Sequence, residues 1–317
     1  IFETTTRLKK MKTRFTLFIT ALVFVSAYGQ KDLSFEEYNP PSTLVVPGEQ
    51  VIRAKYPFID IHGHQYNMPD QDLSPVITAM DTLNMAIMVN LSGRSGEKLL
   101  KSVNNIKSNA PNRFVVFANI DFKGVGQEGW SIKTVTQLER DVANGARGLK
   151  IYKSLGMRYK DADGKRVAIN DSRLDPIWEK CGELGIPVLI HSADPKSFWD
   201  DFDKDNERWL ELKTHPRRKR TANDPAPWEQ IIGEQHSMFK KHPNTKFINA
   251  HMGWYANDLD KLSELMDEMP NMFVEIGAII AELGRQPRFA RVYISSIHLN
   301  ITEPENQKTR GLHYVIS

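Results

Sequence analysis

The hexapeptide Ile59-Asp60-Ile61-His62-Gly63-His64 decides how the rest of the sequence is interpreted. Apolar and polar residues alternate along it, which predicts a β-strand. Residues two apart in a strand point to the same face, so Asp60, His62 and His64 are expected to project together. Two adjacent imidazoles can bind a divalent cation, and Asp60 is placed to accept a ring N–H and fix the tautomer. A His-x-His pair is weak evidence alone, so a metal site needs support from the other strands.

Short apolar runs alternate with helical patterns through most of the remaining chain. The expected strands are residues 58–64, 85–92, 113–122, 148–154, 187–192, 246–252 and 272–277, and the expected helices are 75–83, 97–109, 134–144, 174–184, 226–241 and 259–268. This alternation indicates parallel strands joined by right-handed crossovers. The near-continuous apolar strands favour a closed barrel. A doubly wound open sheet would carry a glycine-rich turn after its first strand, and none is present. We therefore predict an α/β fold of the (β/α)-barrel type.

Two more of the predicted strands run directly into a histidine, in Val188-Leu-Ile-His191 and in Phe247-Ile-Asn-Ala-His251. The carboxyl ends of parallel barrel strands meet at one rim, where the active sites of such barrels lie. Three strand ends that bring histidine to the same rim predict a metal site there. The other histidines lie in helical or irregular sequence and are interpreted as unrelated to it.

Lys150 and Glu275 are charged residues inside the apolar runs Gly148-Leu-Lys-Ile-Tyr152 and Met272-Phe-Val-Glu-Ile276. A buried ammonium is costly unless it is paired, so we expect Lys150 to have a role near the site. Lys150 could be a carboxylated ligand that bridges two metals, or an unmodified lysine that contacts the substrate or supports the ligands. We favour the unmodified lysine and one metal. Glu275 could be the counterion of Lys150 or could position a donor of the substrate.

The segment from Ala193 to Trp228 is long, charged and rich in tryptophan, and it follows the fifth predicted strand. In a barrel it would lie over the catalytic face, as a lid or a pocket wall. Its basic run, residues 215–220, is interpreted as a solvated loop surface. The tryptophans that follow strands could wall an aromatic pocket or serve only for packing; they are Trp199, Trp209, Trp228 and Trp254.

The His62-x-His64 pair, His191, His251 with its following Met252-Gly253, and the segment Glu282-Leu-Gly-Arg-Gln286 together resemble the amidohydrolase superfamily, specifically its amidohydrolase-2 (amidohydrolase-related) branch. The resemblance runs from about residue 58 to about residue 290. It implies a TIM-like (β/α)8 barrel with one divalent metal ion, zinc in the first place and manganese or another divalent ion as alternatives. Carried to this sequence, it makes His62, His64 and His191 metal ligands and His251 the catalytic histidine.

The resemblance also implies the chemistry. Members of this branch hydrolyse an amide, lactone or ester bond of a small organic substrate, sometimes an aromatic one, with a water activated by the metal. Other members are carboxy-lyases, which decarboxylate aromatic and related acids without a redox cofactor. The sequence does not choose between hydrolase and decarboxylase.

The sequence departs from the family pattern after Arg291. The pattern has an eighth strand that ends in an aspartate, which helps to hold the metal and accepts a proton from water. The last aspartate here is Asp267, and residues 292–317 hold no such motif. We therefore expect a barrel domain over residues 57–291, truncated or frameshifted after its seventh strand, followed by an aberrant tail over residues 292–317. An inactive truncated product and a non-catalytic exported barrel are accordingly two alternatives to the enzyme.

Residues 11–29 have the parts of a secretory signal peptide. Lys12 and Arg14 follow Met11, an apolar run covers residues 15–25, and Ser26-Ala-Tyr-Gly29 provides small residues for cleavage. The apolar run is too short to be a membrane span. We therefore expect an exported protein, periplasmic or secreted, with residues 1–10 as an untranslated leader and residues 30–56 as an N-terminal strap.

The chain of 317 residues has a net charge of +3, but the loss of residues 1–29 removes five Lys or Arg and one acid and leaves −1. The basic balance therefore gives no reason to expect a nucleic-acid partner. We expect a small-molecule substrate and no stable membrane association, and a homo-oligomer is left open. Cys181 is the single cysteine, so the mature fold depends on its core and not on an intramolecular disulfide.

Expression from Met11 in a bacterial host with a periplasm is expected to give a mature protein that begins near Gln30 and lies outside the cytoplasm. The reason is that signal peptidase cleaves after small residues such as those at positions 27 and 29. N-terminal sequencing of the exported fraction checks the prediction. An exported protein that still carries residues 15–25 would contradict it.

Overall fold

A computed structural model describes residues 33–45, 48 and 51–286 of the chain. The chain divides into two units, residues 1–49 and residues 50–317. The described part of the first unit contains a turn at residues 35–37, and all the helices and strands reported below belong to the second. None of the helices in the described ranges has the length and apolar character that a membrane span requires. The signal peptide and the tail predicted from the sequence, residues 11–29 and 292–317, lie outside the described residues.

Parallel strands form the centre of the second unit. One sheet has the order β1 (Phe58–Gly63), β2 (Met85–Asn90) and β3 (Phe114–Val116), and a second has the order β4 (Ala118–Asn119), β5 (Leu149–Ile151), β6 (Val188–Ile190), β7 (Phe247–Asn249) and β8 (Met272–Val274). Every strand pair in these two sheets is parallel and joins strands that are neighbours in the sequence. The predicted α/β fold with parallel strands is confirmed.

Strands β3 and β4 are the two parts of one predicted strand, residues 113–122, and they connect the two sheets. The N–H of Phe117, the residue between them, donates to the carbonyl of Asn90 at 3.0 Å, and the N–H of Ala118 donates to the carbonyl of Gly148 at 2.8 Å. This stretch of chain therefore has the β2 side as one neighbour and the β5 side as the other. The two sheets form one series of seven strand positions, as the sequence predicted. In the described residues, β1 and β8 are each paired with one strand only.

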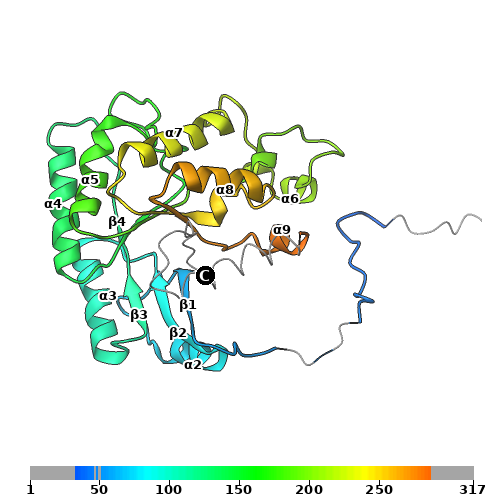
Figure 1. Cartoon of the computed structure of the whole chain (residues 1–317), viewed down its shortest axis with the longest axis horizontal. Coiled ribbons are helices and arrows are strands. Elements are labelled where there is room, and N and C mark those ends of the chain that lie inside the picture. The colour runs from blue at the N-terminus through cyan, green and yellow to red at the C-terminus, as the bar shows by residue number, and fades with distance from the viewer. Residues whose placement is uncertain (1–32, 46–47, 49–50, 287–317) are drawn as a thin grey trace, which may run out of the picture. The chain divides into compact units, whose positions relative to one another are not determined.

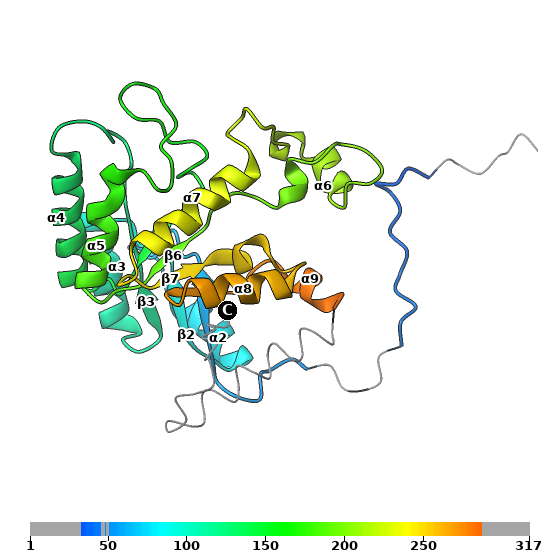
Figure 2. The ribbon, with the colours of Figure 1, turned by 45° about the horizontal axis from the view of Figure 1, so that its top comes forward.

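Most of the helices cover the outside of the strands. The helices are α2 (Ser74–Leu83), α3 (Gly96–Asn109), α4 (Trp130–Ala143), α5 (Asp175–Glu183), α6 (Trp209–Thr214), α7 (Trp228–Lys241), α8 (Leu259–Glu268) and α9 (Ile280–Gly284). Figures 1 and 2 show α3, α4 and α5 side by side outside the strands, whereas α6 and α9 lie away from them. Each covering helix turns an apolar stripe inward; in α8 the stripe is Leu259, Leu262, Leu265 and Met266.

Alternate strand residues divide the core into two layers. Val188 and Ile190 of β6 join the large cluster that includes the helices, whereas Leu189 between them joins a smaller cluster of Ile61, Val89, Leu91, Phe117, Ile248 and Ala250. Residues of a strand point alternately to its two faces, so the smaller cluster marks the face turned away from the helices. It fills the inside of the strand series below the ends at which the histidines lie.

A β-bulge in β1 corrects one detail predicted from the sequence. Asp60 pairs with Met88 and Gly63 pairs with Asn90, so three steps along β1 match two steps along β2. One extra residue breaks the strict alternation that we expected from Asp60 to His64. The side chains of His62 and His64 consequently meet different neighbours, as described below.

The close approach of β2 to the β3–β4 junction depends on Gly93. A Cβ atom added there would lie 2.3 Å from the backbone oxygen of Phe117 and 2.3 Å from a methyl of Val116. Gly93→Ala is therefore expected to lower the free energy of unfolding by about 1–3 kcal/mol, because the contact is with backbone that cannot move away.

Gly233 provides the matched control for this prediction. It is an exposed residue of α7, and an added Cβ meets no atom within 4 Å. Gly233→Ala is expected to raise the free energy of unfolding by up to about 1 kcal/mol through helix propensity. Denaturant unfolding of both variants measures the two changes, and an unchanged or more stable Gly93→Ala protein would contradict the packing described here.

Candidate metal centre

Four histidines from three strand ends lie in one cluster, which we call the histidine cluster: His62, His64, His191 and His251. His62 lies in β1 and His64 follows it, His191 comes directly after β6, and His251 comes two residues after β7. The ring centroids are 5.4 Å apart for His62 and His64, 5.1 Å for His62 and His251, and 4.5 Å for His191 and His251. The structure thus brings together the four histidines singled out in the sequence.

Three rings of the histidine cluster are held through their Nδ1 atoms. Nδ1 of His62 lies 2.8 Å from Oε1 of Glu275, and Nδ1 of His64 lies 2.7 Å from the hydroxyl of Ser92. Nδ1 of His251 lies 2.7 Å from the carbonyl oxygen of Gly277. A ring whose one nitrogen is held by a protein oxygen is oriented to offer the other nitrogen to a metal. Each of these rings is therefore set to coordinate through Nε2.

The donor atoms fit a divalent cation. Ligand atoms of His62, His251 and Glu275 lie within 4.8 Å of one another. Nε2 of His191 is buried and has no hydrogen-bond partner within the described part of the chain. A buried polar atom without a partner is costly unless something binds it. Imidazole nitrogen and carboxylate oxygen are ligands of zinc and related ions, so the cluster suits such a metal. The compact group of His62, His251 and Glu275 differs from the predicted ligand set of His62, His64 and His191. The ligand roles remain a prediction.

Glu275 is the central carboxylate of the site and follows β8 directly. It is fully buried, and besides the His62 ring it accepts the backbone N–H of His251 at 2.7 Å and the backbone N–H of Gly277. Burial acts to raise the pKa of this carboxyl, but the hydrogen bond from His62 and the neighbouring imidazoles outweigh it and lower the pKa to about 2. Glu275 is thus an anion at neutral pH that orients the histidines.

Asp60 does not hold a histidine ring, although its place in the strand suggested that role. Its Oδ1 accepts the backbone N–H of His62 at 2.8 Å, and the ring of His62 is held by Glu275 instead. Asp60 lines a cavity of about 370 Å³ that opens beside His62 and His251. The carboxylate is therefore near the histidine cluster but is not one of the groups that fix its tautomers.

Burial keeps three of the imidazoles neutral. Desolvation is the largest cause that lowers the pKa of His64 to about 4 and that of His251 to about 4, and it lowers the pKa of His191 well below its usual value. The other histidines and the ammonium of Lys150 add to this effect. A neutral imidazole is the form that binds a metal, so protons do not compete for these nitrogens at neutral pH.

Left-handed backbone conformations follow several strands at this end of the sheet. Residues 251–254, directly after β7, have φ values of 57°, 52°, 59° and 68°, and only one of them is glycine. Ala193 after β6 and Ala278 after β8 have φ values of 56° and 58°. Such conformations cost of order 1–3 kcal/mol each and persist where the surrounding structure requires them. Here they end the predicted strand 246–252 early, at Asn249, and turn the His251 ring toward the cluster.

Lys150 lies in β5, and its ammonium is buried without a hydrogen-bond partner among the described residues. Desolvation lowers its pKa to about 7, and the negative charge of Glu275 opposes that shift. The ammonium lies 5.6 Å from the centroid of the Tyr152 ring. Glu275 therefore acts on Lys150 through its charge. The hydrogen bonds of Glu275 go to the ring of His62 and to the backbone N–H groups of His251 and Gly277.

Ser92 and Tyr152 are members of the site that the sequence analysis missed. The Ser92 hydroxyl lies between the His64 ring and the Tyr152 hydroxyl, which is 3.1 Å away, and Tyr152 also donates to the carbonyl of Leu91. Both follow the carboxyl ends of strands, β2 and β5, as the histidines do. That position was the signal that could have identified them.

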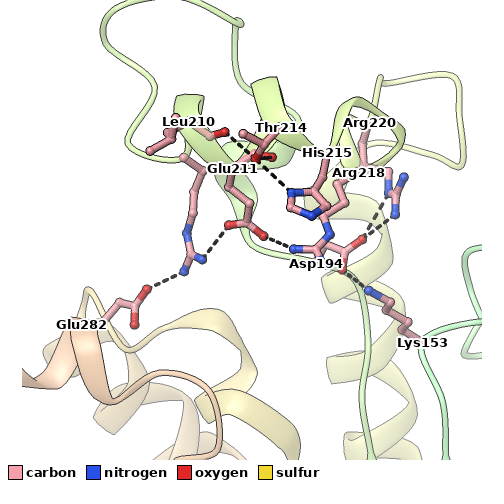
Figure 3. Close-up of polar contacts among 10 residues, drawn as sticks. Lys153, Asp194, Leu210, Glu211, Thr214, His215, Arg218, Arg220 and Glu282 are labelled. Carbon is pink, nitrogen blue, oxygen red and sulfur yellow. Dashed lines mark hydrogen bonds and ion pairs between the residues drawn. The ribbon is translucent and has the colours of Figure 1, made fainter. Parts of the chain in front are cut away.

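The segment after β6 is held by ion pairs and lines a cavity beside Trp254. Asp194, which is buried, accepts from Lys153 after β5 and from Arg220 within the segment, at 2.8 Å in the second case. Figure 3 shows this pair of contacts and a second network in which Glu211 meets Arg218. The predicted lid or pocket wall is thus attached to the ends of β5 and β6.

Trp254 is the tryptophan that meets the histidine cluster. Its ring centroid lies 4.8 Å from that of His251 and 5.7 Å from that of His191, and its indole N–H donates to the carbonyl of Ser192 at 2.9 Å. The other three tryptophans that follow strands pack within the segment after β6. Trp199 and Trp228 donate to backbone carbonyls, and Trp209 stacks on Phe202.

Lys150→Met is expected to stabilise the metal-free protein at pH 7 and to reduce the rise in stability toward pH 10. Between about pH 7 and 10.5 the lysine is neutral in the folded state and charged in the unfolded state, so the wild-type free energy of unfolding rises with pH there, by up to about 1.4 kcal/mol per pH unit. Denaturation at pH 7, 8, 9 and 10 measures the slope. Lys98→Met, at an exposed lysine, is the control, and equal slopes in the two variants would contradict this account.

Comparison with known proteins points to the same family as the resemblance found in the sequence. A family model described as amidohydrolase matches residues 59–298. No curated protein matches the sequence at a significant level.

Solved structures resemble the chain at low identity. An uncharacterised TIM-barrel protein from Bordetella bronchiseptica is 13% identical, with 81% of this chain and 95% of that chain covered and a TM-score of 0.47. A 4-oxalomesaconate hydratase from Rhodopseudomonas palustris is 16% identical, with 69% and 74% covered and a TM-score of 0.43. A 5-carboxyvanillate decarboxylase from Sphingomonas paucimobilis is 12% identical, with 78% and 72% covered and a TM-score of 0.43.

The family match includes every strand of the described sheets except the first residue of β1, and it includes all four histidines of the cluster. It confirms the resemblance found in the sequence. The chain therefore belongs to the amidohydrolase family.

Proposed function

We propose that this protein is a metal-dependent hydrolase that cleaves an amide, lactone or ester bond of a small organic substrate. The observation that carries the proposal is the histidine cluster, in which burial lowers the pKa of His64, His191 and His251 and three rings are anchored through Nδ1 near the buried Glu275 carboxylate. A ring that is held through Nδ1 is oriented to offer Nε2 to a divalent ion, and the ring centroids lie 4.5–5.4 Å apart. Zinc is the ion we propose, because imidazole and carboxylate are its usual ligands.

His62, His64 and His191 are the proposed ligands, with Glu275 holding the first of them in orientation. A bound divalent ion would supply Lewis acidity, which lowers the pKa of a water toward about 7 and polarises a carbonyl. His251 is the proposed catalytic residue, because its Nδ1 is fixed on Gly277 and its lowered pKa leaves Nε2 free to accept a proton.

Wild-type protein is expected to contain close to one divalent ion per chain and to lose it in His62→Ala. Elemental analysis of protein purified without chelator measures the metal. Glu275→Gln is expected to weaken metal binding or activity by about 10–100-fold, since it removes the anion that orients a ligand ring. His215→Ala is the control, because His215 is exposed and lies outside the cluster; it should leave the metal content unchanged.

Activity is tested on a panel of activated esters, lactones and amides, with release of carbon dioxide from aromatic carboxylic acids measured in parallel. Hydrolysis that chelator abolishes and added zinc restores supports the proposal. Metal-dependent release of carbon dioxide without hydrolysis would replace the hydrolase with a decarboxylase. Unchanged metal content in His62→Ala would remove the proposed ligand, and turnover that survives full removal of metal would refute the metal-dependent mechanism.

A further inference from the structure

A second cavity, of about 210 Å³, lies beyond Trp254 on the side of the segment after β6, and we call it the tryptophan cavity. Three parts of the chain line it: the segment after β6, the turn after β7 and the beginning of α9. Its apolar surface comes from Trp254, Ala256 and Ile279, of which the last two are buried. A cavity of about 150 Å³ suffices for a benzene ring, so this one has room for a ring or a branched alkyl group.

Trp254 makes the tryptophan cavity a neighbour of the proposed metal centre. The indole contributes to the lining of the cavity, and the same ring lies 4.8 Å from His251 between centroids. One side chain therefore contacts both places.

The two basic residues that line the tryptophan cavity, Arg208 and Lys196, already form ion pairs with carboxylates of the protein. Nη1 of Arg208 donates to Glu211 at 3.0 Å and Nη2 donates to Glu282 at 2.5 Å, so the two ends of the guanidinium fork hold carboxylates. Lys196 lies 3.2 Å from Glu229, which is not part of the lining. An anionic group in the cavity would have to displace one of these carboxylates, so the cavity does not suit an anion.

Acidic residues outnumber basic residues in the lining of the tryptophan cavity. Asp200 has no ion pair within the described ranges, and Glu207 meets Arg285 only at 3.6 Å on the surface. Exposed pairs of this kind contribute little neutralisation. Ser197, which is 6% exposed, also lines the cavity, and its hydroxyl is buried without a hydrogen-bond partner in the described part of the chain. A buried hydroxyl without a partner indicates a missing polar group, because leaving it unpaired is costly.

We propose that the tryptophan cavity binds a positively charged group that carries apolar surface, such as an arylalkyl- or alkylammonium. The indole of Trp254 offers a π-face that attracts a cation, the apolar lining accepts the hydrocarbon, and Asp200 and Ser197 offer oxygens to the N–H groups. The assignment of this cation to the substrate rests on the proposed function, and it makes the substrate an amide, ester or lactone with an ammonium at one end. Binding of the cation itself does not depend on catalysis.

The test compares benzylammonium with benzyl alcohol, its neutral counterpart of nearly equal shape, and with benzoate. Calorimetric titration of the full chain at low salt is expected to show benzylammonium binding more tightly than the other two. Asp200→Asn is expected to weaken benzylammonium binding by about two- to fivefold, which is the range of an exposed ion pair. Asp201→Asn is the matched control, because it makes the same change of charge at the next residue, which does not line the cavity; it should leave binding unchanged.

Benzyl alcohol or benzoate binding as tightly as benzylammonium would overturn the proposal, as would equal weakening by the two variants, which would indicate a general charge effect. Failure of all three compounds to bind would also overturn it. Titration of His62→Ala separates this inference from the proposed function. Unchanged benzylammonium affinity in that variant supports a site in the cavity whether or not the chain holds metal, whereas loss of the affinity would place the cation at the histidine cluster and refute the tryptophan cavity.

Discussion

The buried carboxylate of Glu275 is the group on which the arrangement of the site depends. It follows β8, at one end of the strand series, and it meets the ring of His62 in β1, at the other end, at 2.8 Å. It also accepts the backbone N–H of His251 after β7. No pairing of β1 with β8 is present in the described residues, so a side-chain anion makes the contact there that backbone hydrogen bonds make between the other strands. The charge is tolerated in the interior because imidazole and backbone N–H groups surround it.

The remaining polar groups of the site are arranged in the same manner, each by an element next to a strand end. Ser92 after β2 holds His64, Gly277 after β8 holds His251, and Asp194 after β6 holds Arg220 of the segment that follows β6. Left-handed turns after β6, β7 and β8 direct the chain so that these contacts are possible. A rigid set of strand ends combined with strained turns is a typical way to hold several ligands within bonding distance of one another.

Much of this organisation could be predicted from the sequence, because strand periodicity and the place of a residue in its strand are local properties. The seven strand positions and the meeting of His62, His64, His191 and His251 follow from apolar runs that end in histidine. Other features depend on contacts between distant residues. The pairing of Glu275 with His62 joins residues 213 positions apart, so no local pattern indicated that Glu275 and not Asp60 would hold the ring.

Two local features of the structure also escaped prediction, for different reasons. The bulge in β1 is a matter of register with β2, which alternation within β1 does not reveal. The early end of β7 comes from left-handed conformations at His251 and Met252, residues whose types give no sign of them. Both features change which way a histidine points, so the site was predicted as a group of residues and not as a geometry.

The desolvated imidazoles have a consequence for the ion in acidic surroundings. An ordinary histidine, with a pKa near 6.5, is only about 3% deprotonated at pH 5, so protons take most of its nitrogens away from a metal. His64 and His251, with pKa values lowered to about 4, are about 90% deprotonated at the same pH. Proton competition at these two rings is thereby moved about 2.5 pH units downward. In a compartment at pH 5, protons would therefore occupy most nitrogens of an exposed pair of histidines but only a minor share of those of His64 and His251.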